Sequence, residues 1–212
     1  DTDYDLQYSN NTNVGTAYVT VIGKGNYAGA LNSTFTIGQA TLTVTPTTTG
    51  KVYGENEPTL AYTISDKPAA TPDLDLSGAL SRAPGEIMGD YAILLNTLRE
   101  TSGNYTLELS GTPQFTVAPK SLNDDSAIQQ ELTTNGLTVG YTGAAFAGNL
   151  DIRYNSELLG LLALTKDKDY TLKCEKKSVD DGGNVSYAEN DAEDAGEYRV
   201  TVTGTGNYTD SF

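Results

Sequence analysis

The chain has 212 residues and a formal net charge of −15, with no histidine, no tryptophan and a single cysteine. The acidic balance argues against binding to nucleic acid or anionic lipid, because neutralising phosphates requires clustered Lys and Arg side chains. The lack of histidine removes Ser-His-Asp and Cys-His catalysis and the usual His-containing zinc sites. The length predicts more than one domain, and the many Thr, Val, Tyr and Gly residues favour strands joined by Gly and Asn turns.

A strand that runs into a Gly-x-Gly-Asn-Tyr turn occurs near both ends of the chain. The copies are residues 19–29 and 200–210, and a shorter echo occurs at residues 102–106. Recurrence at domain spacing indicates a tandem array. A phosphate-binding loop would need a strand that leads into a helix, whereas each copy here connects two strands. We therefore interpret the turn as architectural.

Residues 1–38 predict three strands, at residues 4–8, 16–22 and 34–37. The middle segment, residues 39–118, has a turn-rich passage at 51–58 and a loop with two prolines at 65–75. Its alternating stretches predict strands at residues 42–45, 60–64, 76–82, from 89 to 93, 105–109 and 115–117.

The last segment, residues 119–212, begins with a possible helical turn at residues 126–132. Residues 158–164 fit either a short helix or a buried strand, which periodicity does not distinguish. Residues 180–184 have the chemistry of a hairpin tip. The alternating stretches predict strands at residues 137–141, 150–154, 170–174, 185–187 and 197–203.

Several pieces of the middle segment occur in the order of a known repeat. They are Lys51-Val52-Tyr53-Gly54, residues 58–64, residues 76–82, residues 89–93, residues 103–107 and Phe115-Thr116-Val117. With these pieces the segment resembles the MBG-type repeat of large bacterial surface proteins and adhesins. It departs from the usual pattern in the loop at residues 67–75, which carries Pro68 and Pro72.

The flanking segments resemble a companion Ig-like repeat of the same kind of protein. The last segment matches it at Tyr141-Thr142-Gly143, residues 169–172, residues 196–200 and residues 204–209, and the first matches it at Asp3-Tyr4, Gly15 and residues 23–27. The resemblance implies an extracellular, array-forming β-module, and it implies no catalytic residues.

We therefore predict an all-β fold of tandem modules arranged end to end. Residues 1–38 are expected to be the C-terminal half of an Ig-like repeat, and residues 39–118 an MBG-like domain, either β-grasp-like or a plain sandwich. Residues 119–212 are expected to be an Ig-like domain without its last strand. Since Asp3-Tyr4 aligns with Asp169-Tyr170, the first segment lacks a counterpart of residues 120–168. We expect the chain to be a piece of a longer array, with exposed sheet edges near its start.

Two glycine-tyrosine pairs are candidates for the tyrosine corner of immunoglobulin-type sandwiches. They are Gly196 with Tyr198 and Gly89 with Tyr91, while Ala17 occupies the tyrosine position of the first segment. In such a corner the glycine adopts an unusual backbone conformation and the tyrosine hydroxyl bonds to the main chain. A structural role is therefore expected for these residues.

Other candidates for chemistry have simpler explanations. The acidic stretches at residues 189–194 and 123–125 do not match the spacing of a calcium loop, and Cys174 lies in an alternating strand that suits a buried apolar residue. Asn104-Tyr105-Thr106 and Asn207-Tyr208-Thr209 fit the glycosylation sequon, but turn chemistry explains them in a bacterial protein. We expect no catalytic residue, no metal site and no cofactor.

The function predicted is that of a non-catalytic repeat segment in a secreted or surface-anchored bacterial protein, serving as a stalk or spacer and in adhesion. The alternative is a ligand-binding module that recognises a glycan or host protein through the loops at residues 65–75 or 180–184. Neighbouring repeats of the same polypeptide are the expected partners, with a host glycan or extracellular protein as the adhesive target. Neither nucleic acid nor membrane insertion is expected.

Overall fold

The computed structural model describes residues 2–68, 74–124, 126–130, 138–140, 142–146 and 150–212. The regular structure of these residues consists of β-strands without a helix, as the sequence predicts. No helix among them has the length and hydropathy needed to cross a membrane.

The chain divides into two compact units, which we describe separately. The first comprises Asp1–Thr49, Thr59–Ala83 and Ala92–Gln114, and the second comprises Gly50–Pro58, Pro84–Tyr91 and Phe115–Phe212. The expected boundaries near residues 38 and 118 fall inside these units, so the three-domain division stays a prediction.

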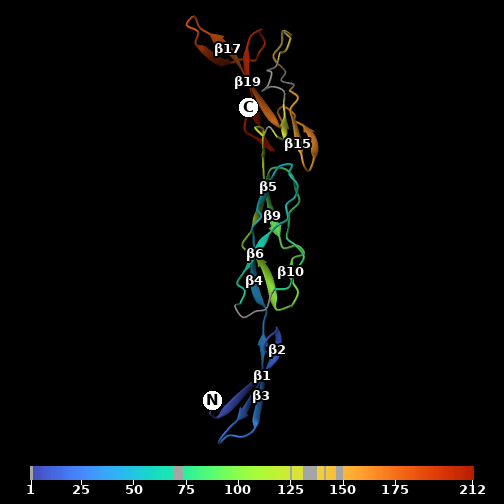
Figure 1. The fold of residues 1–212 in the computed structure, drawn as a ribbon, viewed down its shortest axis with the longest axis vertical. Coiled ribbons are helices and arrows are strands. Elements are labelled where there is room, and N and C mark those ends of the chain that lie inside the picture. The colour runs from blue at the N-terminus through green and yellow to red at the C-terminus, as the bar shows by residue number, and fades with distance from the viewer. Residues whose placement is uncertain (1, 69–73, 125, 131–137, 141, 147–149) are drawn as a thin grey trace. The chain divides into compact units, whose positions relative to one another are not determined.

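The first unit begins with an antiparallel sheet of order β1-β2-β3, drawn in blue in Figure 1. Its strands are β1 (Tyr4–Ser9), β2 (Gly15–Gly23) and β3 (Ala30–Ile37). In β1 every residue is exposed, so neither face of this edge strand is covered. The three strands predicted for this segment are confirmed.

The rest of the first unit is built around β4 (Ala40–Pro46), which pairs in parallel with β11 (Tyr105–Leu109) and antiparallel with β6 (Tyr62–Ser65). Leu42 and Val44 of β4 are fully buried, while the threonines between and beside them face outward. This is the period-2 pattern expected of a strand covered on one face. The short strands of this unit are β7 (Leu76–Ser77), β8 (Ser81–Arg82) and β10 (Arg99–Glu100).

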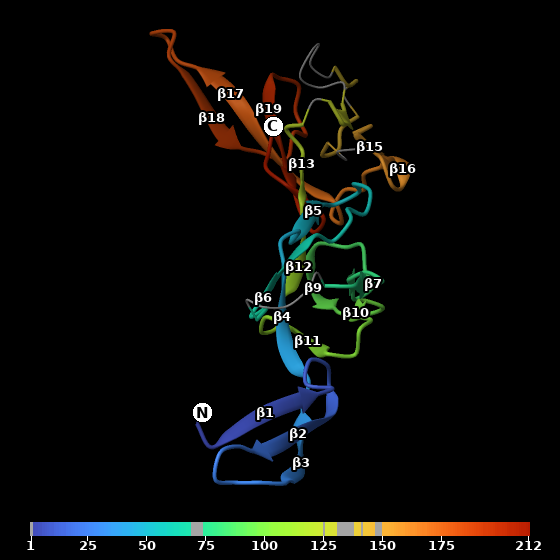
Figure 2. The ribbon, with the colours of Figure 1, turned by 60° about the horizontal axis from the view of Figure 1, so that its bottom comes forward.

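Strands β9 (Gly89–Leu94) and β12 (Gln114–Ala118) each have residues in both units. Within the second unit, β12 pairs in parallel with β5 (Gly50–Val52). Two further sheets of this unit have the orders β14-β15-β16 and β18-β17-β19, and β13 pairs in parallel with β20. Figure 2 shows the long β17-β18 hairpin in orange. The strands are β13 (Lys120–Ser121), β14 (Ile128–Gln129), β15 (Arg153–Ser156), β16 (Gly160–Ala163), β17 (Tyr170–Val179), β18 (Val185–Glu189), β19 (Tyr198–Gly204) and β20 (Tyr208–Thr209).

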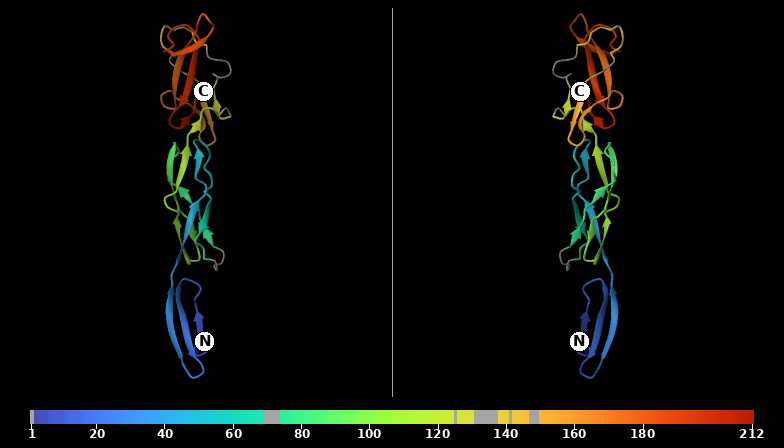
Figure 3. Two further views of the ribbon diagram at one scale, coloured as in Figure 1. Left: turned by 90° about the vertical axis from the view of Figure 1, so that its left-hand side faces the viewer. Right: turned by 90° about the vertical axis from the view of Figure 1, so that its right-hand side faces the viewer.

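The core of the second unit lies beneath β17 and β19. Eight buried residues form it: Leu122, Ile128, Ile152, Tyr154, Leu164, Tyr170, Val202 and Tyr208. The chain ends beside the same sheet (Figure 3), where the Phe212 N–H donates to the Val202 carbonyl at 3.1 Å.

The two copies of the Gly-x-Gly-Asn-Tyr turn have the same geometry in their separate units. Tyr4 pairs with Gly23 in the first copy, and Tyr170 pairs with Gly204 in the second. The Gly23 N–H donates to the Gly29 carbonyl at 3.0 Å, and the Gly204 N–H donates to the Asp210 carbonyl at 2.8 Å. The motif therefore encodes one local structure twice.

Glycine is required twice in each turn, for two reasons. Gly25 and Gly206 have φ values of 64° and 61°, a region that residues with a Cβ avoid. A Cβ at Gly23 would lie 2.9 Å from the Tyr27 carbonyl carbon, and one at Gly204 would lie 2.7 Å from the Thr209 nitrogen. The backbone closes back on itself too tightly for a side chain.

Several local predictions need correction. Ile128–Gln129 is strand β14, so the helical turn at residues 126–132 is wrong where the chain is described. Residues 138–140 contain no strand, and residues 137 and 141 lie outside the described part of the predicted strand 137–141. The ambiguous stretch 158–164 contains β16, which is a strand but not a buried one, because Leu161 is 53% exposed.

The strand predicted at residues 76–82 is interrupted into β7 and β8. Gly78 lies between them with a φ of 85°, and a Cβ there would be 2.0 Å from the Thr97 carbonyl oxygen. The chain bends at Gly78 because the Thr97–Leu98 backbone passes against it.

Candidate functional site

The N-terminal sheet exposes apolar side chains whose counterparts in the second unit are buried. Tyr4 is 39% exposed and its counterpart Tyr170 is 2% exposed. Tyr27 of the repeated turn is 63% exposed, whereas Tyr208 is 5% exposed. The pairing register is the same in both copies, so the difference lies in what covers the sheet. In the second unit, the covering residues come from residues 122–164.

The first candidate centre is formed by Tyr53 and Gly54 with two side chains of β15. Tyr154 Oη donates to the Tyr53 carbonyl and Ser156 Oγ to the Gly54 carbonyl, each at 2.7 Å. The Leu158 N–H donates to the same Gly54 oxygen at 2.9 Å. Gly54 has a φ of 82°, and a Cβ there would lie 2.4 Å from Tyr154 Oη, so this position requires glycine.

Three tyrosine rings pack together at the same place. The Tyr53 and Tyr208 ring centroids are 5.6 Å apart, and the Tyr154 and Tyr208 centroids are 6.1 Å apart, both in edge-to-face geometry. Burial, followed by the nearby Tyr53 and Asp169, raises the pKa of the Tyr208 hydroxyl well above its ordinary value. A phenol held neutral in this way suits packing and hydrogen bonding rather than proton transfer at physiological pH.

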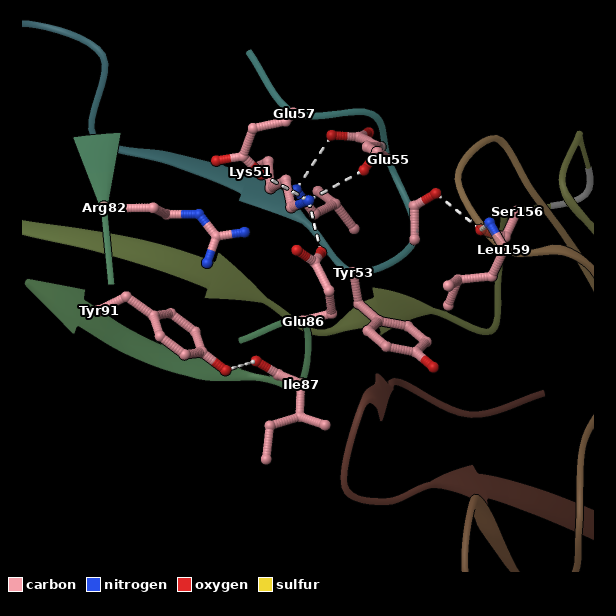
Figure 4. Close-up of polar contacts among 12 residues, drawn as sticks. Lys51, Tyr53, Glu55, Glu57, Arg82, Glu86, Ile87, Tyr91, Ser156 and Leu159 are labelled. Atoms are coloured by element: carbon pink, nitrogen blue, oxygen red, sulfur yellow. Dashed lines mark hydrogen bonds and ion pairs between the residues drawn. The ribbon is translucent and has the colours of Figure 1, made fainter. Parts of the chain in front are cut away.

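The second candidate centre is Lys51 on β5 (Figure 4). Its side chain is 2% exposed, and its Nζ lies 2.7 Å from Glu86 Oε2 and 2.9 Å from Glu57 Oε2. The Glu55 carbonyl accepts a third contact from Nζ at 3.1 Å. Burial lowers the pKa of Lys51, but the hydrogen bonds and charges of Glu86 and Glu57 outweigh burial, and the pKa is raised. The lysine is therefore a charged, fully engaged structural group.

Sequence reasoning missed the Lys51 centre and the polar partners of Tyr53. A signal for the lysine was present, since Glu55 and Glu57 follow Lys51 closely within the turn-rich passage at residues 51–58. Nothing local indicated Glu86 or Ser156, because they come from distant parts of the chain.

Both predicted tyrosine corners bond as expected. Tyr198 Oη donates to the Asp194 carbonyl at 2.8 Å, and Tyr91 Oη donates to the Ile87 carbonyl at 2.7 Å (Figure 4). Gly89 has a φ of 149°, in the region that favours glycine. Gly196 does not have a positive φ, so the expectation of an unusual backbone is wrong at that residue.

The comparison with protein families identifies the segment that contains Lys51, Tyr53 and Tyr91. Residues 42–116 match the family described as the MBG domain, YGX type. The middle segment is an MBG-type repeat. The match covers about a third of the chain, and the family suggests a repeat domain of bacterial surface proteins. No curated protein and no solved structure matches the chain.

The Tyr53-Gly54-Glu55 sequence of the MBG repeat fits the Y-G-x pattern in the family description. Tyr53 and Gly54 have a defined physical role in this chain, because their carbonyls accept hydrogen bonds from side chains of β15. The Glu55 carboxylate accepts the Val52 N–H at 3.0 Å and closes the turn.

The acidic stretches make contacts within the chain where it is described. Asn190 Oδ1 accepts the Ala192 N–H at 2.8 Å, and Asp194 Oδ2 lies 3.3 Å from Lys176 Nζ. Asp124 pairs with Lys120 and accepts the Ser126 hydroxyl, and these contacts lower its pKa to about 2. The described residues include no group of three potential metal ligands. Asp125 lies outside the described residues.

Cys174 is half-buried on β17, opposite Val200 of β19. Burial raises the pKa of its thiol, Lys166 opposes that shift and Asp191 adds to it. A raised pKa reduces the thiolate fraction and with it the reactivity. The environment therefore favours the packing role expected from the sequence.

The alternative function places ligand binding on the loops at residues 65–75 or 180–184. At the hairpin tip, Asp180 Oδ1 accepts the N–H groups of Gly182 and Asn184 at 2.9 and 2.8 Å, which confirms a turn at residues 180–184. In the loop at residues 65–75, residues 69–73 lie outside the described chain.

The sequon asparagines Asn104 and Asn207 are both engaged through their side chains. Asn104 Oδ1 accepts the Val14 N–H at 2.8 Å, and Asn207 Oδ1 accepts the Met88 N–H at 2.7 Å. Each asparagine thus contacts a residue more than eighty positions earlier in the chain, a role beyond that of a local turn.

Proposed function

We propose that this chain is a non-catalytic repeat segment of a secreted or surface-anchored bacterial protein and acts as a stalk or spacer. The observation that carries the proposal is the MBG repeat at residues 42–116 together with the two like-built sheets on either side of it in sequence. On this proposal, the flanking segments are Ig-like repeats and the chief partners are neighbouring repeats of the same polypeptide.

The polar centres of the chain support a mechanical role. Lys51, Tyr154 and Ser156 have their hydrogen-bonding groups directed at main-chain carbonyls or at carboxylates of the chain. Groups satisfied in this way stabilise a fold and have little capacity left for a substrate. The alternative is adhesion, in which the segment recognises a glycan or host protein through its loops.

A surface-display experiment tests the spacer function. One, two or three tandem copies of the segment are placed between a membrane anchor and a fluorescent tag on a bacterial surface, and the height of the tag is measured. A folded spacer raises the tag by equal steps, because each copy adds a fixed length. A Gly/Ser linker of equal residue number is the control, since its span grows with about the square root of its length.

The spacer function is refuted when the height of the tag grows no faster than with the control linker. A mucin and glycan array, probed with the same segment, tests the alternative. Specific binding that disappears when residues 180–184 are replaced by an Asn-Gly turn assigns the segment to ligand recognition instead. The replacement joins the paired residues Val179 and Val185 by a two-residue hairpin connection, so the strands β17 and β18 are retained.

A further inference from the structure

The side chain and main chain of Asn104 hold two different parts of the first unit. Its Oδ1 accepts the Val14 N–H at 2.8 Å, and its Nδ2 donates to Asn13 Oδ1 at 3.1 Å. Its carbonyl accepts the Ala40 N–H, at the start of β4, at 3.1 Å. Asn104 therefore joins the turn before β2 to the first strand of the MBG repeat.

Asn207 repeats this arrangement in the second unit. Its Oδ1 accepts the Met88 N–H at 2.7 Å, and its carbonyl accepts the Lys120 N–H at 2.9 Å. Met88 belongs to the turn before β9 of the MBG repeat, whereas Lys120 begins β13 of the following segment. Asn207 thus holds the start of its own segment and a turn of the preceding one.

The two donors occupy the same position in their segments. Val14 directly precedes Gly15, which has a φ of 139°, and Met88 directly precedes Gly89, which has a φ of 149°. Each glycine begins the strand that carries the tyrosine-corner position, which is Ala17 in β2 and Tyr91 in β9. The two acceptors are the asparagines of the Gly-Asn-Tyr turn in the next segment. We call this pair of contacts, from Oδ1 and from the carbonyl of one asparagine, the asparagine clasp.

Both halves of a further clasp are present at the outer segments. Ala195 is exposed and directly precedes Gly196, the glycine of the tyrosine-corner pair with Tyr198, so it corresponds in sequence to Val14 and Met88. Gly196 differs from Gly15 and Gly89 in lacking a positive φ. Asn26 lies in the first Gly-x-Gly-Asn-Tyr turn and corresponds to Asn104 and Asn207. Within the described chain, neither the Ala195 N–H nor the Asn26 side chain has a hydrogen-bond partner.

We infer that the asparagine clasp is the element by which each repeat docks on the preceding one, and that the turn at Ala195 is the docking site for the next repeat. The occupant is a β-repeat whose Gly-Asn-Tyr turn presents an asparagine side-chain oxygen to the Ala195 N–H. This inference rests on the proposed array function and names the contact that joins its members. A main-chain donor suits such a site, because it is retained whatever side chain precedes the glycine.

The clasp inside the chain is tested first, in the full 212-residue protein. Asn207→Leu removes the acceptor, whereas Asn207→Asp retains an oxygen at Oδ1. Hydrogen exchange of the Met88 amide, read by NMR, is expected to accelerate about five-fold in the leucine variant, which corresponds to the loss of a hydrogen bond worth about 1 kcal/mol. The aspartate variant is expected to keep the protection of Met88.

The Lys120 amide reports whether the turn itself survives, because it bonds to the Asn207 carbonyl and not to the side chain. Unchanged Lys120 protection with faster Met88 exchange supports the clasp. Equal acceleration at both amides shows that Asn207→Leu opens the turn, and unchanged exchange at Met88 shows that Oδ1 does not hold it. Either of these results overturns the clasp.

The docking site is tested by extending the chain with a second copy of residues 32–118 after Phe212. The register supports this join, since the bridge from Thr203 to Ser211 matches the pairing of Ile22 with Ala30. The Ala195 amide is expected to exchange about five-fold more slowly in the extended protein than in the original. That protection is expected to vanish when the appended copy carries Asn104→Leu.

Ala195 exchange that is equally fast in the original and in both extended proteins overturns the inference. Protection of Ala195 that rises with concentration in the original protein and is lost in Asn26→Leu shows the same contact formed between two chains, and supports the inference. The height measurement on the bacterial surface is independent of both outcomes. A spacer that extends normally without a clasp therefore separates failure of this inference from failure of the proposed function.

Discussion

Replacing Tyr208 or Tyr27 with alanine makes the same chemical change at the same position of the repeated turn. The two side chains differ in their surroundings, since Tyr208 is 5% exposed and Tyr27 is 63% exposed. Tyr208 also packs edge-to-face against Tyr53 and Tyr154. Removing a buried aromatic side chain from a core costs about 3–5 kcal/mol, so Tyr208→Ala is expected to destabilise the second unit by about 4 kcal/mol.

Tyr27→Ala is the matched control and is expected to cost less than about 0.5 kcal/mol, as surface substitutions usually do. Native-state hydrogen exchange gives the local free energy of opening at each amide. In Tyr208→Ala, the amides of β17 and β19 are expected to lose protection by a factor approaching a thousand, since about 1.4 kcal/mol corresponds to ten-fold. In Tyr27→Ala, the amides of β1 and β2 are expected to change by less than about three-fold.

Comparable losses of protection in the two variants would refute this reasoning. They would show that the tyrosine stabilises the turn locally, through the strand–turn geometry that both copies share, and that the covering residues add little. A second variant, Tyr208→Phe, separates the ring from the hydroxyl. It is expected to keep most of the stability, because the ring contacts remain.

Three further predictions concern individual contacts. Lys51→Met is expected to lower the free energy of unfolding of the second unit by about 2 kcal/mol in urea denaturation, because the Glu55 carbonyl loses its donor and the Glu57 and Glu86 carboxylates lose their contacts with the buried ammonium. Glu86→Gln is expected to cost less. A Lys51→Met variant as stable as the original would contradict the ion-pair role. Gly54→Ala is expected to lower the free energy of unfolding by about 2–4 kcal/mol, measured by thermal unfolding, because alanine is strained at the positive φ and its Cβ overlaps Tyr154. Gly103→Ala is the control, since Gly103 has a φ of 79° and nothing lies within 4 Å of an added Cβ. It is expected to cost only the backbone strain of about 1–2 kcal/mol. Acid is expected to destabilise the chain as the pH falls from about 4 to about 2. The folded pKa of Asp124 is lowered to about 2, below the unfolded value of about 3.9, so the unfolded state binds more protons in this interval. A urea midpoint that does not change between pH 5 and pH 2.5 would contradict this expectation.

The long alternating strands could be predicted from the sequence because their pattern is local. Residues 42–45 alternate threonine with buried Leu42 and Val44, and β17 likewise places Tyr170 and Leu172 against the core at alternate positions. The same holds for the turn residues, since Gly25 and Gly206 are needed for their own backbone conformation. Local physical chemistry decides these features.

The short strands could not be predicted, because their partners are distant in sequence. β5 pairs with β12 and β13 pairs with β20, in each case across more than sixty residues. A strand of two or three residues has no periodicity to recognise. The Lys51 centre was missed for the same reason, since its partner Glu86 comes from another part of the chain. Residues 158–164 could not be assigned from their pattern, because within this leucine-rich stretch Leu161 is exposed whereas Leu164 is buried.

The repeated turn shows how one short sequence serves two levels of structure. Its glycines and its strand register are the same in both copies, so the motif alone encodes the backbone path. Burial of its tyrosine differs between the copies, because burial depends on residues supplied by another segment. Its asparagine belongs to neither category: the carbonyl of Asn207 holds its own segment, while the side chain holds the preceding one. The motif is therefore constrained at its glycines by the backbone path and at Asn207 by the contact with Met88.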